Sequence, residues 1–274
     1  MSDRIALTLR SRPPGSVDAS SLALHDWSER SDSDIGRLTV RVAGSGPVAL
    51  GDLFRIDGGR SSSVRLTGDF TAFEGLGTEL AGGDVLIEGN VGDRVGTRMR
   101  GGQLTVTGNA AWGAGLEMAG GVLDIGGDAG SRAGGAPLGA KRGMTGGELI
   151  VRGNAGTETG AGMRRGLIAV AGNAGEGAGR TTLAGTVVVF GATGPNPGQW
   201  SKRGTIVALG PVTPPATYRY ACTYRPQYLA VLLRHLATDR RLPVTGEHLT
   251  GSYQRYSGDL AELGAGEILA WTRT

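Results

Sequence analysis

The 274-residue sequence has little of what most catalytic and metal-binding sites are built from. Its one cysteine, Cys222, cannot form an internal disulfide, and its histidines (His25, His235 and His248) are too far apart in sequence for a metal-ligand motif. There is no apolar run of about 18 residues and no signal-peptide pattern at the N-terminus. These absences predict a cytoplasmic protein that binds no metal and does not span a membrane.

Lysine and aromatic residues are also scarce. Lys141 and Lys202 are the only lysines among 28 basic residues, aromatic residues make up 5% of the chain, and the net charge is +3. Proteins that bind nucleic acids typically combine a strongly basic patch with aromatic side chains that stack on bases. The composition therefore argues against a nucleic-acid partner, and the excess of arginine is typical of GC-rich genomes.

Glycine is abundant, with 51 residues, and it marks an internal repeat. The glycines do not recur at every third position, which excludes a collagen helix. The copies start 21, 19, 19, 26, 19, 19 and 19 residues apart. They read SSSVRLTGD from Ser61, GGDVLIEGN from Gly82, GGQLTVTGN from Gly101, GGVLDIGGD from Gly120, GGELIVRGN from Gly146, RGLIAVAGN from Arg165, AGTVVVFGA from Ala184 and RGTIVALGP from Arg203.

Apolar residues alternate within each copy, as in Val85 and Ile87 or Leu104 and Val106, which is typical of a short strand with one buried face. Such a strand is too small to fold alone, whereas stacked copies share a continuous apolar interior. The sequence therefore predicts an all-β dominated fold: a parallel β-helix, or solenoid, of about eight coils with repeats of ~19 residues, right-handed by the general rule for parallel crossovers.

Other residue types recur at fixed places between the strands. Methionine precedes four of the copies (Met99, Met118, Met144 and Met163), and glycine stands at one bend of four coils (Gly96, Gly115, Gly160 and Gly179). We interpret the methionines as interior packing and the glycines as bends with positive φ. The Asn and Asp residues that follow the strands are interpreted as corner residues that hydrogen-bond from coil to coil.

The chain divides into three predicted parts, because the repeat occupies only its middle. Residues 1–60 are predicted to form a small β-rich N-terminal cap, residues 61–212 the repeat domain, and residues 213–274 a C-terminal capping and interaction segment. In the last part we expect an amphipathic helix within 226–240 and a final strand at 266–271. One coil is longer than the rest, and its extra residues lie within 134–145.

The sequence contains no recognisable catalytic motif, and we assign no catalytic residue. Four acidic residues (Asp84, Glu88, Asp124 and Glu148) fall on outward strand positions, where we expect them to face solvent. Arginines just before the aligned copies (Arg98, Arg100, Arg142, Arg164 and Arg165) are expected to lie near one side of the stack, close to Lys202 and Arg203. A row of cations attracts an extended polyanion, whereas a purely structural role for the same residues remains an alternative.

Several segments together carry a family resemblance. They are MRGGQLTVTGNAAWGAGLEMAGGVLDIGGDAG, KRGMTGGELIVRGNAGTETGAGMRRGLIAVAGNAGEGAG, SDIGRLTVRVAGSG, LGDLFRIDG and RYSGDLAELGAGEIL. With these segments the sequence resembles the C subunits of formylmethanofuran dehydrogenase and of the related bacterial formyltransferase/hydrolase complex over nearly its whole length. The repeat alone also resembles the C-terminal domain of glutamate synthase large chains.

The resemblance implies a non-catalytic structural subunit that works beside hydrolase and formyltransferase subunits in tetrahydromethanopterin-linked formaldehyde oxidation. The arginine content favours this bacterial complex over a tungsten or molybdenum formylmethanofuran dehydrogenase, and a glutamate synthase accessory domain is a further alternative. The chain itself is expected to bind no cofactor. Carriers of the methanofuran type bear glutamate-rich tails, so the arginine row has a polyglutamylated carrier as its candidate ligand.

Overall fold

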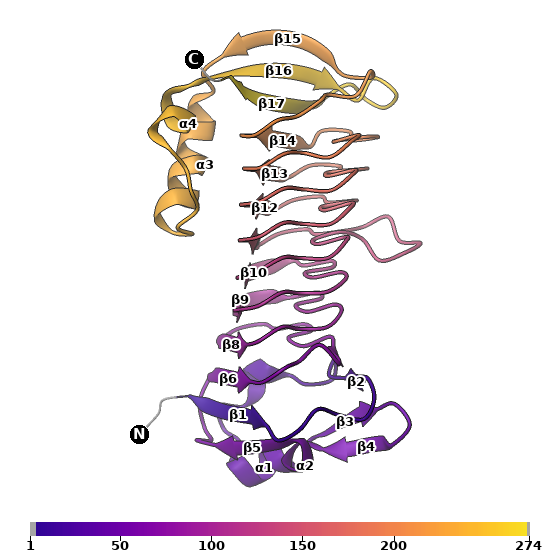
Figure 1. Cartoon of the computed structure of the whole chain (residues 1–274), viewed down its shortest axis with the longest axis vertical. Coiled ribbons are helices and arrows are strands. Elements are labelled where there is room, and N and C mark those ends of the chain that lie inside the picture. Colours follow the sequence, from indigo (N-terminus) through magenta and orange to yellow (C-terminus); the bar gives the residue numbers. More distant parts are fainter. Residues whose placement is uncertain (1–3, 273–274) are drawn as a thin grey trace.

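The chain forms a stack of coils that is closed at both ends by further strands and helices (Figure 1). The computed structural model describes residues 4–272. Within them, the main sheet has 13 strands in the order β15-β16-β17-β14-β13-β12-β11-β10-β9-β8-β6-β1-β5. Neighbours pair in parallel from β1 to β17, whereas β5, β16 and β15 are antiparallel additions at the two ends.

Eight of the parallel strands, β6 and β8 to β14, coincide with the sequence repeat, and β1 and β17 extend the parallel sheet at its two ends. The parallel strands are β1 (Ile5–Leu9), β6 (Ser63–Thr67), β8 (Asp84–Glu88), β9 (Arg100–Val106), β10 (Gly120–Ile125), β11 (Glu148–Val151), β12 (Leu167–Val170), β13 (Thr186–Val189), β14 (Thr205–Ala208) and β17 (Gly266–Thr272). Val85, Leu104, Leu123 and Leu149 are register partners on successive strands and are at most 2% exposed. The apolar interior column that the alternation predicts is confirmed.

The methionines and the bend glycines complete this interior. Met99, Met118, Met144 and Met163 are fully buried in the same core as the column, which confirms their role in packing. Gly96, Gly115, Gly160 and Gly179 all have positive φ, as predicted. At Gly96 a Cβ would also lie 3.0 Å from Cδ2 of Leu123, so a side chain there would crowd this leucine as well as strain the left-handed backbone.

The corner after each strand carries a ladder of side-chain hydrogen bonds. Oδ1 of Asn90 accepts from the backbone N–H of Asn109 at 2.8 Å, and Oδ1 of Asn109 accepts from Asp128 at 2.7 Å. The same contact continues through Asn154 to Asn173, whose backbone N–H donates at 2.9 Å. Each coil therefore supplies the acceptor for a backbone N–H of the next, and the predicted role of these corner residues is confirmed.

The N-terminal part contributes to two sheets. Strand β1 continues the parallel register, with Ile5 beside Val64, and β5 (Phe54–Asp57) pairs antiparallel with it. A smaller sheet contains β4 (Gly46–Ala49), β3 (Thr39–Val42), β2 (Val17–Asp18) and β7 (Phe73–Glu74), and the short helices are η1 (Leu24–Asp26), α1 (Asp32–Arg37) and α2 (Leu50–Leu53). The rings of Phe54, Phe70 and Phe73 pack within 5.3–6.2 Å and cover the first coil of the stack.

The C-terminal part closes the other end of the stack. Its elements are β15 (Arg219–Tyr224), α3 (Gln227–Thr238), α4 (Gly246–Thr250), β16 (Ser252–Gly258) and β17. The predicted helix within 226–240 is thus confirmed as α3, and the predicted final strand as β17, in which Ile268 pairs with Ile206 of β14. None of the helices formed by residues 4–272 has both the length and the apolarity of a bilayer-spanning segment.

Helix α3 covers the outer face of the later coils, where the structure differs from our expectation of solvated outward positions. Leu229, Leu233 and Leu236 of α3 pack on the outward residues of β11 to β14 and β17, which are Ile150, Ala169, Val188, Val207 and Leu269. These outward residues are fully buried. The sheet is therefore buried on both faces along its C-terminal half, as parallel sheets usually are.

Candidate functional site

The first two residues of the predicted arginine row share a single carboxylate. Arg98 and Arg100 flank the buried Met99 where the chain enters β9, and both side chains are exposed. Nη2 of Arg98 lies 3.2 Å from Glu79 of the preceding coil, and Nη2 of Arg100 lies 3.5 Å from the other oxygen of the same carboxylate. Part of their charge is therefore neutralised within the chain.

Charge alternates along this part of the stack. Glu79, Arg98 and Glu117 occupy the same position on successive coils, each with positive φ (56°, 54° and 54°) and each donating its backbone N–H to the next coil. Opposite charges on neighbouring coils stabilise the stack slightly, as exposed ion pairs do. The acidic Glu117 separates Arg98 and Arg100 from the other three arginines of the row.

The remaining arginines lie further along the same side. Arg142 belongs to the long coil, and Arg164 and Arg165 form the corner before β12; all three are exposed. Arg164 and Lys202 occupy equivalent positions two coils apart, since each donates its backbone N–H to the corner of the preceding coil, at Met144 and Thr182. This end of the row is the one at which cations from different coils gather.

Arg164 and Lys202 also line a cavity of about 350 Å³, together with Ala140, Lys141, Thr181, Leu183, Trp200 and Glu262. Lys141 comes from the long coil and Glu262 from the turn between β16 and β17, and both segments project from the same side of the stack (Figure 1). Nζ of Lys202 is 3.7 Å from Glu262, and the guanidinium of Arg180 lies 4.4 Å above the ring of Trp200. The cavity thus offers an aromatic surface beside three cations and one carboxylate.

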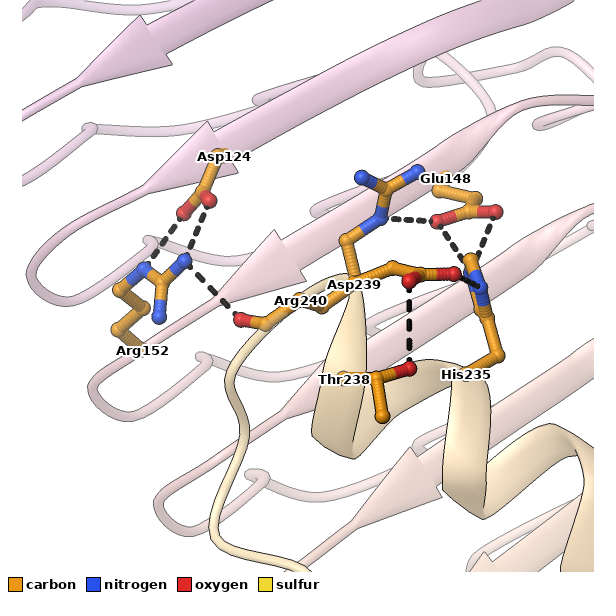
Figure 2. A network of polar contacts seen from close by, with 7 residues as sticks. All are labelled: Asp124, Glu148, Arg152, His235, Thr238, Asp239 and Arg240. Carbon is orange, nitrogen blue, oxygen red and sulfur yellow. Dashed lines mark hydrogen bonds and ion pairs between the residues drawn. The ribbon is translucent and has the colours of Figure 1, made fainter.

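A second polar cluster lies on the outer face of the sheet, beneath the end of α3 (Figure 2). Glu148 of β11 receives hydrogen bonds from Nε of Arg240 at 2.6 Å and from Nε2 of His235 at 3.0 Å, and Asp239 lies 2.6 Å from Nδ1 of the same imidazole. Beside them, Arg152 forms two hydrogen bonds to Asp124 at 2.6 and 2.8 Å and a third, at 3.2 Å, to the backbone oxygen of Arg240.

The cluster stabilises its own charged forms. Burial is the largest effect on Glu148 and opposes ionisation, but the hydrogen bonds and charges of Arg240 and His235 together outweigh it, so the pKa of Glu148 lies below its ordinary value. Burial also opposes the charged imidazole of His235, yet the hydrogen bonds to Glu148 and Asp239 raise the pKa of His235 above its ordinary value. Both residues are thus favoured as an ion pair.

These contacts correct the expectation that Asp124 and Glu148 face solvent. Their side chains are only 13% and 24% exposed, because α3 and the segment after it cover this part of the sheet. Asp84, on an earlier coil that α3 does not reach, is exposed as expected. The polar atoms of the cluster are occupied by one another, so its arrangement is suited to attaching α3 to the sheet rather than to proton transfer on a substrate.

Among residues 4–272, no group of three or more His, Cys, Asp or Glu side chains is arranged to hold a metal ion.

The cavity beside Trp200 was not predicted from the sequence, because its residues come from 140–202 and 262 and meet only when the coils stack. The burial of Asp124 and Glu148 beneath α3 does correspond to a pattern in the sequence. Outward positions in the earlier strands are occupied by Leu86, Thr105 and Asp124, whereas Ile150 and Val188 make the later strands apolar on both faces.

Comparison with known proteins identifies the family of the chain. No protein-family model and no curated protein sequence matches it. It is similar to a chain in the X-ray crystal structure of the formyltransferase/hydrolase complex (FhcABCD) from Methylorubrum extorquens in complex with methylofuran, with 36% sequence identity and a TM-score of 0.87 over 98% of this chain and 100% of that chain. The protein therefore belongs to the family of that formyltransferase/hydrolase complex subunit.

Proposed function

We propose that this protein is the structural C subunit of a formyltransferase/hydrolase complex in tetrahydromethanopterin-linked formaldehyde oxidation. The observation that carries the proposal is the near full-length similarity to a chain of such a complex, which in that structure contains methylofuran. In this role the chain forms no active site of its own and brings hydrolase and formyltransferase subunits together.

The architecture supports a scaffolding role on physical grounds. In this proposal the stack is a right-handed β-helix, in which each coil contacts only its neighbours. The parallel register from β1 to β17 supports it. Such a rod presents partners at fixed separations. The titratable cluster around Glu148 is engaged in contacts within the chain, which leaves it suited to stability rather than catalysis.

The arginine row is the proposed contact for the carrier. Arg98, Arg100, Arg142, Arg164 and Arg165 are all exposed, and the polyglutamate tail of a methanofuran-type carrier is an extended polyanion that such a row attracts. A tail that stays bound while the formyl group moves between subunits raises the effective concentration of the carrier at the second site. In this proposal the last three arginines contribute most, because Arg98 and Arg100 share Glu79.

Co-expression with the hydrolase and formyltransferase subunits of the same source tests the proposal. The full chain is expected to co-purify with both in fixed stoichiometry, measured by native mass spectrometry, and to have no formyltransferase or hydrolase activity when purified alone. Co-purification with a tungsten or molybdenum dehydrogenase subunit instead favours formylmethanofuran dehydrogenase. Association with a flavin and iron–sulfur protein favours glutamate synthase.

A further inference from the structure

The two loops that contribute Lys141 and Glu262 to the cavity beside Trp200 carry large exposed apolar side chains. Trp200 is 42% exposed, Leu138 of the long coil 74%, and Leu260 and Leu263 of the turn between β16 and β17 56% and 63%. The long coil and this turn border the cavity through Lys141 and Glu262. Single exposed apolar residues need no explanation, but a group of them on two loops around one cavity is typical of an interaction site.

The coil does not require an aromatic residue at position 200. Trp200 has positive φ (61°), and the same backbone conformation at the equivalent corner holds Glu79, Arg98, Glu117 and Thr181 on other coils. Its backbone N–H donates to Asp259 at 2.8 Å, a contact that any residue at this position can make. The indole itself is therefore dispensable for coil closure, while bulky residues at positive φ are otherwise uncommon.

Positively charged side chains are also concentrated in this cavity. Both lysines of the chain, Lys141 and Lys202, line it, although 28 basic residues are distributed over the sequence. With Arg164 they give three cations against the single carboxylate of Glu262, which already pairs with Lys202 at 3.7 Å. Because positive charge is in excess, the cavity favours a negatively charged ligand.

We infer that the Trp200 surface, defined as this cavity with Leu138, Leu260 and Leu263 of the two loops that border it, docks an acidic segment of a partner protein subunit. The segment packs an apolar side chain on the part of Trp200 that stays exposed beside Arg180, and presents carboxylates to Lys141, Arg164 and Lys202. Tryptophan and arginine are enriched among the residues that dominate binding energy at protein interfaces. A polyglutamate tail has no side chains that complement the leucines and the indole, so a protein segment fits the whole surface better.

The inference rests on the proposed function, since the partner is taken to be a subunit of the same complex, but it can be tested apart from the carrier site. Arg164 is the one residue common to the Trp200 surface and the arginine row. Substitutions of Trp200 and of the two lysines therefore change the docking surface and leave all five arginines of the row in place.

The first experiment measures the affinity of the full-length chain for the purified hydrolase and formyltransferase subunits of the same source. Trp200→Thr, which copies Thr181 of the preceding coil, and Lys202→Thr are expected to weaken binding of one of them about 10- to 100-fold each. Val231→Thr on α3, where the side chain is 66% exposed, is the matched control and should bind as the wild type does. Thermal unfolding verifies that each variant is folded.

The second experiment uses the scarcity of lysine. Lys141 and Lys202 are the only lysines of the chain, so the zero-length carbodiimide cross-links that join a lysine of this chain to a carboxylate of the partner report on this cavity. We expect cross-links from one or both lysines to Asp or Glu of the bound subunit, and protection of both lysines from acylation in the complex.

Different failures separate the two proposals. A wild-type chain that binds neither subunit overturns both the proposed function and the docking site. Variants that bind like the wild type, with lysines that stay reactive in the complex, overturn the docking site alone. It is also overturned if the variants weaken only the binding of a synthetic glutamate oligomer, or if they abolish only self-association of the chain.

Discussion

Nε of Arg240 donates a hydrogen bond to Oε2 of Glu148 over 2.6 Å, although the two residues are 92 positions apart in the sequence. The same carboxylate accepts from His235, so one side chain of β11 binds both the last turn of α3 and the segment that follows it. Because α3 buries the outward apolar residues of the later strands, this contact fixes where the helix packs on the stack.

Glu148→Gln is expected to lower the free energy of unfolding by about 1–3 kcal/mol, because two charge-assisted hydrogen bonds lose their anionic acceptor in a half-buried site. Chemical denaturation followed by circular dichroism measures the change. The interior column does not depend on this residue, so the variant should keep its strand content.

Glu29→Gln is the matched control, since it makes the same carboxylate-to-amide change at an exposed position far from α3. It should alter stability by less than about 0.5 kcal/mol. Equal effects of the two substitutions would contradict the role of Glu148 in attaching the helix.

The contact between Glu148 and His235 should depend on pH in two directions. The pKa of Glu148 is lowered on folding, so its stabilising contribution is present above the ordinary glutamate pKa and is lost as pH falls through its folded value. The pKa of His235 is raised, so its contribution is fully present below the ordinary histidine pKa and is lost as pH rises through the folded value. The two contributions overlap between about pH 4.5 and 6.5.

Denaturation of the wild type and of His235→Gln at a series of pH values from about 5 to 9 tests the dependence. Glutamine retains a hydrogen-bond donor but does not titrate, so the stability difference between the two proteins should be largest in the overlap and shrink as pH rises above it. A difference that stays constant from pH 5 to 9 would show that His235 is not charged in the folded protein.

The corner ladder predicts a difference between two substitutions of Asn173. Its Oδ1 accepts from the backbone N–H of Ala192 at 2.7 Å. Asn173→Ala removes this acceptor and should cost about 0.5–1.5 kcal/mol, whereas Asn173→Asp keeps it, as Asp128 does on its own coil by accepting from Asn154 at 2.6 Å. Thermal unfolding of both variants measures the difference. Similar losses for Ala and Asp would mean that the side-chain acceptor is not what the corner needs.

The interior of the stack could be predicted from the sequence because it is repeated. Alternation in one copy gives only a weak strand signal, but Val85, Leu104, Leu123 and Leu149 recur at aligned positions, and stacking is the arrangement that buries all of them at once. The buried methionines and the bend glycines follow from the same periodicity. A local pattern that repeats at nearly constant spacing therefore determines both the strands and their register.

Contacts between the stack and the segments outside the repeat could not be predicted in this way. The pairing of β1 with β6, which places Ile5 beside Val64, and the packing of Leu233 on the later strands occur once in the chain and have no second copy to compare. The apolar outward residues Ile150 and Val188 indicated that something covers the later coils. These residues do not indicate which segment covers the later coils, because any amphipathic helix can pack on an apolar sheet face.

The same limit applies to the candidate site. Aligned copies predict that Arg98 and Arg164 lie on one side of the stack. The position of Arg98 is occupied by Glu79 and Glu117 on the neighbouring coils, however, so the charge at that position changes sign from coil to coil. Trp200 and Glu262 meet at one cavity only through the closing turn between β16 and β17, which lies outside the repeat.

The proposed carrier contact predicts unequal effects along the arginine row. Exposed ion pairs contribute about 0.2–1 kcal/mol each, so replacing Arg142, Arg164 and Arg165 together with serine should raise the KM of the assembled complex for a polyglutamylated carrier roughly 3- to 100-fold. Replacing Arg98 and Arg100 should have a smaller effect, because Glu79 already neutralises part of their charge. Steady-state kinetics of the complex, repeated at increasing ionic strength, measures both changes, and the difference from the wild type should shrink as salt screens the pairs.

A carrier without its glutamates is the control for this experiment, because it cannot use the row. Its KM and kcat should be the same for the wild type and for both sets of serine variants. Arg55→Ser, which removes an exposed arginine of β5 at the N-terminal end of the stack, controls for the general loss of positive charge. Equal rises in KM for the full and the truncated carrier would mean that the arginines affect the assembly of the complex rather than the binding of the tail, and the carrier contact would have to be sought on another subunit.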